Sequence, residues 1–174
     1  MYLDRHVDKI FTCDFDEMAS EPKPVAVSDF KPARVKQAMD ILKKSKKPVA
    51  VIGSQALLDP SATDRLTAAI ASMGIPVYLA GMARGLLGRD SATQMRHQRR
   101  NALKAADVVL TAGMPCDFRL GYGRAINAQA KLISVNRSRD DLKLNRKPDL
   151  GILGDPGRFL IALGDHMNHS PSAG

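Results

Sequence analysis

Residues 48–80 read PVAVIGSQALLDPSATDRLTAAIASMGIPVYLA. The stretch begins and ends with short apolar runs, residues 48–53 and 77–80, and the first is rich in β-branched side chains and stops at a glycine. Such runs are typical of strands that are buried on both faces of a parallel sheet. We therefore predict one strand at each end of this stretch.

The residues between these two predicted strands have the spacing and the end signals of a helix. Asp59 is placed to cap the first turn, Pro60 to occupy its first position and Gly74 to end it. Apolar residues recur at helical spacing and predict one buried stripe, made of Leu66, Ala69, Ile70 and Met73. A strand, a helix and a second strand in this order predict a right-handed crossover within a parallel sheet.

The same alternation continues on both sides of this unit. A helical apolar stripe starts at Pro32 and ends near Ser45. Further elements are predicted in order along the chain: a helix at 99–106, strands at 107–111, 132–135 and 150–153, and a last helix after Asp155-Pro156. This order predicts the α/β class, with a doubly wound, mostly parallel, Rossmann-like sheet of five to six strands and helices on both faces.

The length of 174 residues suits a single domain. Residues 1–31 show no sustained periodicity and contain prolines, so we expect them to form a linker from a preceding domain. The Rossmann-like domain is expected at residues 32–166, and residues 167–174 are expected to form a tail.

The net charge of +8 is distributed unevenly. Residues 1–31 hold four basic and seven acidic groups, whereas residues 84–104 hold six basic groups and one acid. A second basic run, residues 43–47, lies at a predicted helix end, where the helix dipole favours lysine, and no aromatic residue interleaves with either run to stack bases. A localised excess of this kind favours a small polyanion, such as a nucleotide or a coenzyme A tail, over nucleic acid.

Sequence features also bear on the compartment. The longest apolar stretches fall short of the roughly 20 residues that span a bilayer, and residues 1–6 lack the pattern of a secretory signal. Cys13 and Cys116 lie in dissimilar contexts without a CxxC motif, which favours two reduced thiols. We therefore predict a cytoplasmic protein with no membrane segment.

In doubly wound sheets, ligands bind beyond the carboxyl ends of the strands. The loops expected there are residues 53–55, 81–96, 112–119 and 136–139. No GxGxxG follows the first predicted strand, and phosphate-loop, HExxH and GxSxG motifs are absent from the sequence. Histidines and carboxylates are dispersed along the chain, so we predict no catalytic residue and no metal ligand.

The segment 113–123, GMPCDFRLGYG, concentrates the residue types that bind a nucleotide. Its glycines allow close approach of the backbone, Arg119 can form a fork to a phosphate, and Phe118 or Tyr122 can cover a ring. The alternatives are that Phe118 belongs to the core and that Arg119 is the partner of a salt bridge.

Polar residues follow two of the predicted strands. Asp117 and Asn136 lie where a ribose or an adenine edge would bind, or else they bond the backbone of their own turns. Asp155 is placed either to contact a ligand or to cap the last helix. Together with Gly113 and Arg119, Asn136 and Arg137 predict a positive field for a diphosphate and ribose.

Five segments between residues 47 and 163 have a recognisable order and spacing: KPVAVIGSQA, GIPVYLAGMARGLLGRD, ALKAADVVLTAGMPCDFRLGYGR, AKLISVNRSRDDLKLNR and GILGDPGRFL. The set resembles the central domain of thiamine-diphosphate-dependent enzymes of the acetolactate synthase and 2-hydroxyacyl-CoA lyase group. CDFRLGYG and SVNRSRDDL look closest to the acetolactate-synthase-like branch, whose activity is lyase chemistry on 2-hydroxyacyl-CoA.

The resemblance implies a domain that is structural and non-catalytic, and that in several relatives binds FAD or ADP. ADP, coenzyme A or FAD is then the expected ligand here, whereas thiamine diphosphate and magnesium would bind outside this chain. The partners implied are the flanking thiamine-diphosphate-binding domains of the same polypeptide, within a homo-oligomer. The family's site positions fall on Gly53, Ser54, Gly113, Phe118, Arg119, Asn136 and Asp155.

The chain departs from the family pattern at three places. Many relatives have two or three glycines at 53–55 and an aspartate where Asn136 stands, and flavin users carry a Gly-Met-x-Gly stretch that residues 95–99 lack. We therefore expect an adenine nucleotide rather than a flavin.

Two other functions are alternatives to this one. The family's activating glutamate and its GDG-to-Asn metal motif have no counterpart in this sequence, which is compatible with an excised central domain or with a free-standing regulatory module. The segment 114–119 also resembles the GIPDFR motif of sirtuin deacylases, but it follows the third predicted strand instead of the first, and only two cysteines are present.

Overall fold

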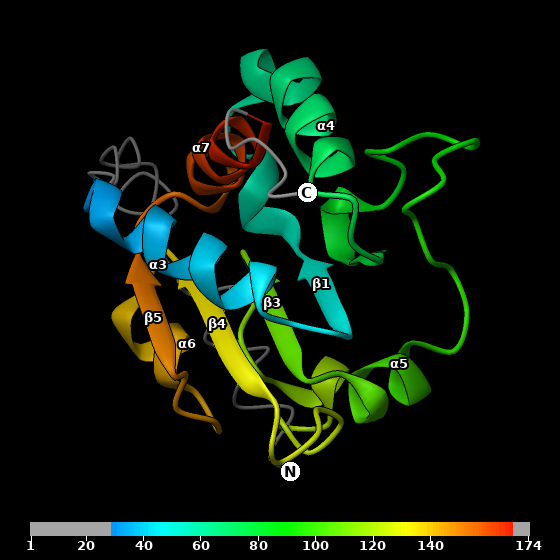
Figure 1. The fold of residues 1–174 in the computed structure, drawn as a ribbon, viewed down its shortest axis with the longest axis vertical. Helices are drawn as coiled ribbons and strands as arrows, with labels where there is room; N and C mark the ends of the chain where they lie inside the picture. Colours follow the sequence, from blue (N-terminus) through cyan, green and yellow to red (C-terminus); the bar gives the residue numbers. More distant parts are fainter. Residues whose placement is uncertain (1–28, 169–174) are drawn as a thin grey trace, which may run out of the picture.

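The computed structural model describes residues 29–168, which form one five-stranded sheet with helices around it (Figure 1). Every strand pair is parallel, and the strand order is β2-β1-β3-β4-β5. The strands are β1 (Pro48–Ile52), β2 (Val77–Leu79), β3 (Val108–Ala112), β4 (Lys131–Asn136) and β5 (Leu150–Leu153). The predicted α/β class and parallel sheet are confirmed, and the chain reverses its direction of winding between β1 and β3.

Within residues 29–168, five α-helices and four short 3-10 turns precede, connect or follow the strands. The helices are α3 (Pro32–Lys43), α4 (Thr63–Ser72), α5 (Arg99–Ala105), α6 (Arg139–Lys143) and α7 (Pro156–Asn168). The 3-10 turns are η1 (Ser54–Leu57), η2 (Pro60–Ala62), η3 (Gly81–Ala83) and η4 (Phe118–Leu120).

Each face of the sheet has its own core because successive strand residues point to opposite sides. In β1, Ile52 packs in a cluster with residues of α3, α4 and α7. Its neighbour Val51 packs in a second cluster with Leu103 of α5, Leu120 and Ile126. Both faces are therefore covered, as a doubly wound sheet requires.

Several element ends differ from the sequence predictions. Asp59 caps the 3-10 turn η2, where its carboxylate accepts the N–H of Ser61 at 3.1 Å, and α4 begins only at Thr63. The short helix α6 was not predicted; it starts where the Ser138 hydroxyl accepts the N–H of Asp141 at 3.2 Å. A single hydroxyl cap over five residues leaves too little periodicity to recognise in the sequence.

The folded region also extends beyond the predicted domain boundaries at both ends. α7 runs to Asn168 and so includes the first two residues of the predicted tail. At the other end, Phe30 of the predicted linker packs edge-to-face against Phe159, with ring centroids 5.5 Å apart. Residues 1–28 of the predicted linker and 169–174 of the predicted tail lie outside the described residues.

The long connection between β2 and α5 folds back along the free edge of β2. Val77 donates to Thr93 O at 2.9 Å and accepts from Met95 N–H at 2.8 Å, so residues 93–95 add one parallel bridge to the sheet. The Tyr78 hydroxyl also donates to the carbonyl of His97 at 2.9 Å. These bonds fix the position of a loop that is rich in arginine.

Between residues 29 and 168, no helix combines the length and the apolar character needed to cross a membrane.

Candidate functional site

The turns after β1 and β3 contact one another at the carboxyl edge of the sheet. Gly53 N–H donates to Ala112 O at 2.8 Å, and Gln55 N–H donates to Gly113 O at 3.3 Å. A Cβ atom on Gly53 would lie 2.6 Å from Gly113 O, and one on Gly113 would lie 2.8 Å from Ala56 N. Gly113 also has a φ of +77°, which favours glycine. Glycine is thus required at both positions, because the two turns approach each other too closely to leave room for a Cβ atom.

A hydrogen-bond network joins the β1 turn to the end of β4. The Gln55 amide donates to Asn136 Oδ1 at 3.1 Å and accepts the N–H of Arg137 at 3.1 Å. Asn136 Oδ1 also accepts the N–H of Ser138 at 2.9 Å, so Asn136 bonds its own turn, as one of the alternatives predicted. Asn136 is fully buried, and its Nδ2 has no hydrogen-bond partner among the described residues.

Ser54 and Asp155 also bond the backbone at this edge. Ser54 Oγ accepts the N–H of Met82 at 3.1 Å, which holds the turn after β2 against η1. Asp155 Oδ1 accepts the N–H of Arg158 at 2.9 Å and so caps α7. At this edge the side-chain oxygens of Ser54, Asn136 and Asp155 each accept a backbone N–H. The structure therefore brings six predicted site residues together here: Gly53, Ser54, Gly113, Asn136, Arg137 and Asp155.

The other two predicted site residues lie on η4. The Arg119 guanidinium bonds both carboxylate oxygens of Asp117, with Nη2 to Oδ2 at 2.6 Å, and these bonds lower the pKa of Asp117. Arg119 is thus a salt-bridge partner, as one alternative predicted. Phe118 is 72% exposed and does not belong to the core; its ring lies beside Arg119, 5.9 Å from the guanidinium carbon.

Two neighbouring cavities open beside α5. The first, which we call the β2 cavity, measures about 570 Å³ and is lined by Tyr78, Leu79, Arg84, Gly85, Gln94, Met95, Arg96 and Arg99. The second, the α5 cavity, measures about 560 Å³ and is lined by Arg99, Arg100, Leu103, Arg119, Gly121, Tyr122, Arg124 and Ala125. They share Arg99, and we refer to both together as the arginine groove.

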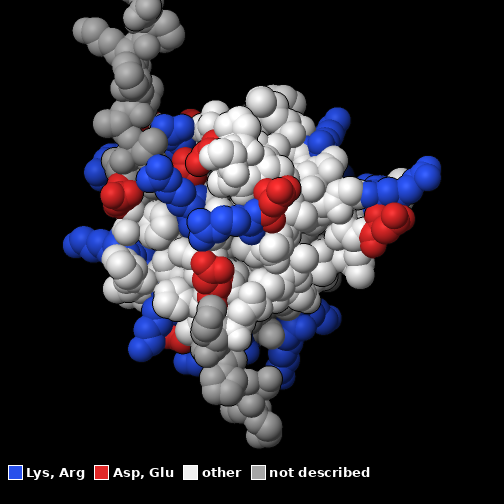
Figure 2. Space-filling view, turned by 90° about the horizontal axis from the view of Figure 1, so that it is seen from above, with Lys and Arg blue, Asp and Glu red and all other residues white. Residues whose placement is uncertain are grey.

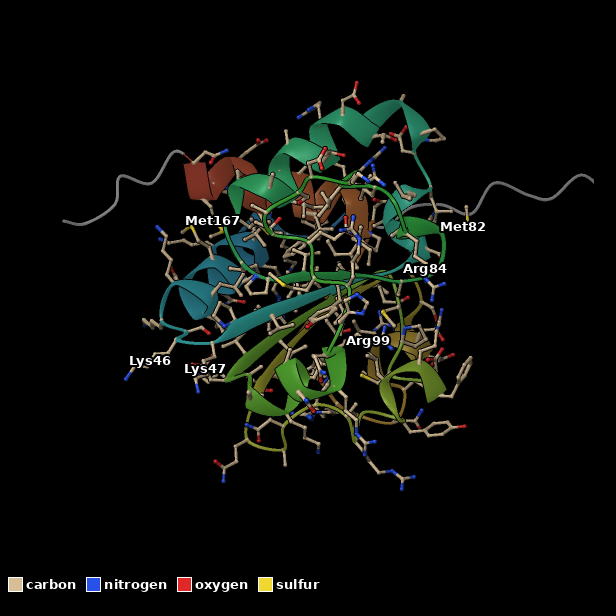
Figure 3. The ribbon with its side chains drawn as sticks, turned by 90° about the vertical axis from the view of Figure 1, so that its right-hand side faces the viewer. Lys46, Lys47, Met82, Arg84, Arg99 and Met167 are labelled. Atoms are coloured by element: carbon tan, nitrogen blue, oxygen red, sulfur yellow. The ribbon has the colours of Figure 1, made fainter. Side chains whose placement is uncertain are left out.

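The arginine groove is strongly cationic. Among the residues described as lining it there are six arginines and no acidic residue. Arg84, Arg100 and Arg124 make no side-chain hydrogen bond or ion pair with the described residues, whereas Arg99 donates to the carbonyl of Arg119 at 2.8 Å. Arg84 and Arg99 lie on the same side of the molecule (Figure 3).

The surface around α4 and α7 is different. There, basic side chains lie beside acidic ones (Figure 2), and Arg65 of α4 approaches Asp165 of α7 to 3.9 Å. At that end opposite charges lie side by side, whereas most arginines of the groove have no carboxylate partner among the described residues; Arg119, which is paired with Asp117, is the exception.

The sequence prediction missed most of the groove. The basic excess of residues 84–104 indicated the groove and favoured a small polyanion as ligand. Arg99, Arg100 and Arg124 were not predicted as individual site residues. Their approach depends on the path of the long connection between β2 and α5, which no local pattern encodes. Gln55 was also missed as an individual residue, although the loop that contains it was proposed.

Residues 35–163 match the family described as "Thiamine pyrophosphate enzyme, central domain". The chain belongs to this family. Segment 114–119 follows β3 as the sequence suggested, and family membership decides against the sirtuin alternative.

Relatives of this central domain are found in longer proteins. It is 41% identical over 166 residues to "2-hydroxyacyl-CoA lyase 2" from Homo sapiens, covering 93% of this chain and 26% of that protein. It is 32% identical over 127 residues to an acetolactate synthase large subunit from Mycobacterium tuberculosis, covering 73% of this chain and 23% of that protein. The chain thus spans about a quarter of the length of these relatives.

A solved structure shows the same fold. Benzoylformate decarboxylase from Polynucleobacter necessarius superposes with a TM-score of 0.57 at 17% identity, over 84% of this chain and 29% of that one. At this identity the likeness concerns the fold alone.

Full-length enzymes of the family use thiamine diphosphate and magnesium, and the residues described here do not fit that pair. Within residues 29–168 no group of three or more His, Cys, Asp or Glu side chains could hold a metal ion. The glutamates of the sequence, Glu17 and Glu21, lie outside the described residues. Cys116 is buried, and burial raises the pKa of its thiol. We therefore derive no step of thiamine chemistry from this central domain.

Proposed function

We propose that this central domain is the non-catalytic, nucleotide-binding unit of a thiamine-diphosphate-dependent lyase or synthase that acts on 2-hydroxyacyl-CoA compounds. Two of the relatives named above are a 2-hydroxyacyl-CoA lyase and an acetolactate synthase, which supports this class of parent enzyme. Calorimetry of the chain with thiamine diphosphate and magnesium is expected to show no micromolar binding. Magnesium-dependent micromolar binding would contradict the non-catalytic role.

The ligand we propose is an adenine nucleotide, either ADP or the ADP part of coenzyme A or FAD. The observation that supports it is the arginine groove, where Arg84, Arg100 and Arg124 project from three segments without a carboxylate partner among the described residues. Guanidinium groups bind phosphate through paired charge-assisted hydrogen bonds. Tyr122, 52% exposed in the α5 cavity, offers a face for a base.

Native mass spectrometry of the purified chain with ADP, FAD, NAD and coenzyme A tests this proposal. We expect a one-to-one complex with ADP and with coenzyme A, and less occupancy by FAD. A chain that retains none of these ligands at concentrations well above micromolar would overturn it.

We also propose that thiamine-diphosphate-binding domains of the same polypeptide flank this unit in a homo-oligomeric enzyme. This chain covers about a quarter of the length of each relative, and the remaining length of those proteins is sufficient for such domains. Exposed apolar side chains near the carboxyl edge, including Leu58, Met82 and Phe118, are suited to cover by them. Light scattering of this chain alone is expected to show a monomer or a weak dimer, and a tetramer at micromolar concentration would contradict the proposed role of the flanking domains.

A further inference from the structure

A short acidic segment of the sequence carries the charge opposite to that of the arginine groove. Residues 14–21, DFDEMASE, contain four carboxylates and no basic residue. Two large apolar residues, Phe15 and Met18, stand among the acids. We call residues 14–21 the acidic segment; it lies outside the described residues. Clusters of arginine are a common way for proteins to bind acidic motifs of this kind.

The arginine groove offers the complementary surface. Arg84, Arg100 and Arg124 are exposed and make no side-chain hydrogen bond or ion pair with the described residues. Apolar side chains are exposed among them: Met95 is 39% exposed in the β2 cavity, and Tyr122 is 52% exposed in the α5 cavity. Because the arginines are distributed over two cavities, a chain with several carboxylates can pair with more of them than one compact anion can.

The backbone of the groove is held in place by hydrogen bonds. Arg96 donates to the carbonyls of Gly88 and Arg89 at 3.1 and 3.2 Å, which closes the loop after η3. On the other side, Lys104 Nζ donates to the carbonyl of Arg124 at 2.8 Å. Since the fold keeps these like charges close together before any partner binds, they attract a polyanionic segment.

The described chain begins within reach of the groove. Asp29 approaches Arg158 to 3.8 Å in the first turn of α7, which follows β5 at the carboxyl edge of the sheet. Arg84 follows β2 at the same edge. The strand order separates β5 from β2 by about 19 Å, at a strand spacing of about 4.8 Å. Residues 17–28 can span up to about 40 Å, so the carboxylates before them can reach either cavity.

We infer that the acidic segment binds in the arginine groove of its own chain. Its carboxylates pair with the arginines that have no acidic partner among the described residues, and Phe15 packs against Tyr122. Because the segment is covalently attached, its effective concentration at the groove is on the order of millimolar, and individually weak ion pairs suffice to hold it there. A nucleotide that uses the same arginines must displace the segment, which therefore regulates access to the groove. Binding of the segment does not require a nucleotide site, so either can be absent while the other exists.

Paramagnetic relaxation measured by NMR on the 174-residue chain tests this inference. A nitroxide is attached to Cys13, next to the acidic segment, since the other cysteine, Cys116, is buried. The backbone amides of Arg84, Arg100 and Tyr122 are expected to lose most of their signal, while amides at the amino edge of the sheet keep theirs. Loss confined to other surfaces, or a weak loss spread evenly over the domain, would overturn the inference.

Salt separates ion pairing from other contacts. At about 1 M salt the Debye length falls to about 3 Å, and the amide signals of the groove are expected to return. Signals that stay weak at this salt concentration would show that charge does not hold the segment, against the inference.

Variants with equal changes of charge show which carboxylates bind. Asp14→Asn combined with Asp16→Asn is expected to restore most of the signal of the groove amides. Asp4→Asn combined with Asp8→Asn removes the same charge from the predicted linker outside the acidic segment, and the signals should stay weak. Equal behaviour of the two double variants would contradict binding by the acidic segment.

The groove is tested in the same way. Arg100→Gln combined with Arg124→Gln should restore the signals of the remaining groove amides. Lys36→Gln combined with Lys43→Gln, two exposed positions on α3, is the matched control and should leave them weak. If the arginine variant behaves like this control, the segment does not bind these arginines; circular dichroism melting confirms that each variant is folded.

A mixed sample distinguishes binding within one chain from binding between two copies. Chains that carry the nitroxide but no isotope label are mixed with isotope-labelled chains without the nitroxide. The groove amides are expected to keep their full signal in this mixture. Loss of signal there would assign the groove to the acidic segment of a second copy and would overturn binding within the chain.

Discussion

The carboxyl edge of the sheet and the arginine groove are both expected places for a ligand, yet the protein uses them differently. At the edge, Gly53 and Gly113 allow two turns to touch, and Gln55 bonds Asn136. In the groove, Arg84 and Arg124 have no such partner among the described residues. Residues that lie where a nucleotide site is expected can therefore stabilise the fold instead of binding a ligand. Cationic groups that have no acidic partner in the fold are the better guide to a ligand site.

The largest effect that tests this comparison is expected at Gly113. Gly113→Ala would place a Cβ atom 2.8 Å from Ala56 N at a φ of +77°, and backbone strain and overpacking should together lower the free energy of unfolding by about 3 kcal/mol. Gly74→Ala is the matched control: φ is +64° but nothing lies within 4 Å, so a loss of about 1 kcal/mol is expected. Urea denaturation measures both. Equal losses would show that the turns do not need to touch.

The Gln55–Asn136 bond is expected to have the next largest effect. Gln55→Ala removes one of the two donors to Asn136 Oδ1 and the side-chain acceptor of Arg137 N–H at a part-buried edge, at a cost of about 2 kcal/mol. A double-mutant cycle with Asn136→Ala should give a coupling energy of about 1 kcal/mol. The affinity for ADP should stay within about twofold of the wild type. Loss of ADP binding with little change in stability would reverse the roles of the edge and the groove.

Within the groove, Arg99 and Arg119 are expected to differ. Arg99→Gln should lower the affinity for ADP about tenfold or more, because this residue lines both cavities. Arg119→Gln should lower it about threefold at most, since the guanidinium is already bonded to Asp117. Calorimetric titration of both variants with ADP measures the difference. A larger loss at Arg119 would place the phosphate at η4 rather than between the cavities.

The smallest effect is expected at the amino edge of the sheet, away from both regions. Hydrogen bonds from Ser45 Oγ and from the backbone N–H groups of Lys46 and Lys47 lower the pKa of Asp107 to about 2 from 3.8. Because the folded pKa lies below the unfolded one, this stabilisation is complete above about pH 4 and is lost as the pH falls toward 2. Solvent screening limits it to about 1 kcal/mol or less.

Acid unfolding monitored by circular dichroism measures this contribution. The difference in free energy of unfolding between the wild type and Asp107→Asn should be constant above about pH 4 and should shrink toward pH 2. A difference that persists unchanged at pH 2 would show that Asp107 does not titrate in this range.

The sequence alone determined the fold class, the strands and most of the helices. Buried parallel strands need nearly continuous apolar runs, as at 48–52 and 108–112. Helices packed against them need an apolar residue every three or four positions. Both signals are local, and so they can be recognised without knowing the partners. The short helix α6 escaped because five residues with one Ser138 cap contain no full stripe.

Only the tertiary structure decided which polar residues are available to a ligand. The sequence placed Asn136 and Asp155 after strands, but whether each bonds a turn or a ligand depends on side chains far along the chain: Gln55 lies 81 residues from its partner Asn136. In the same way, the return of residues 93–95 to the edge of β2 sets Arg96 and Arg99 beside Arg84. Hydrogen bonding and charge act over a few ångströms in space, whatever the separation along the chain, and so these pairings are fixed only when the sheet has formed.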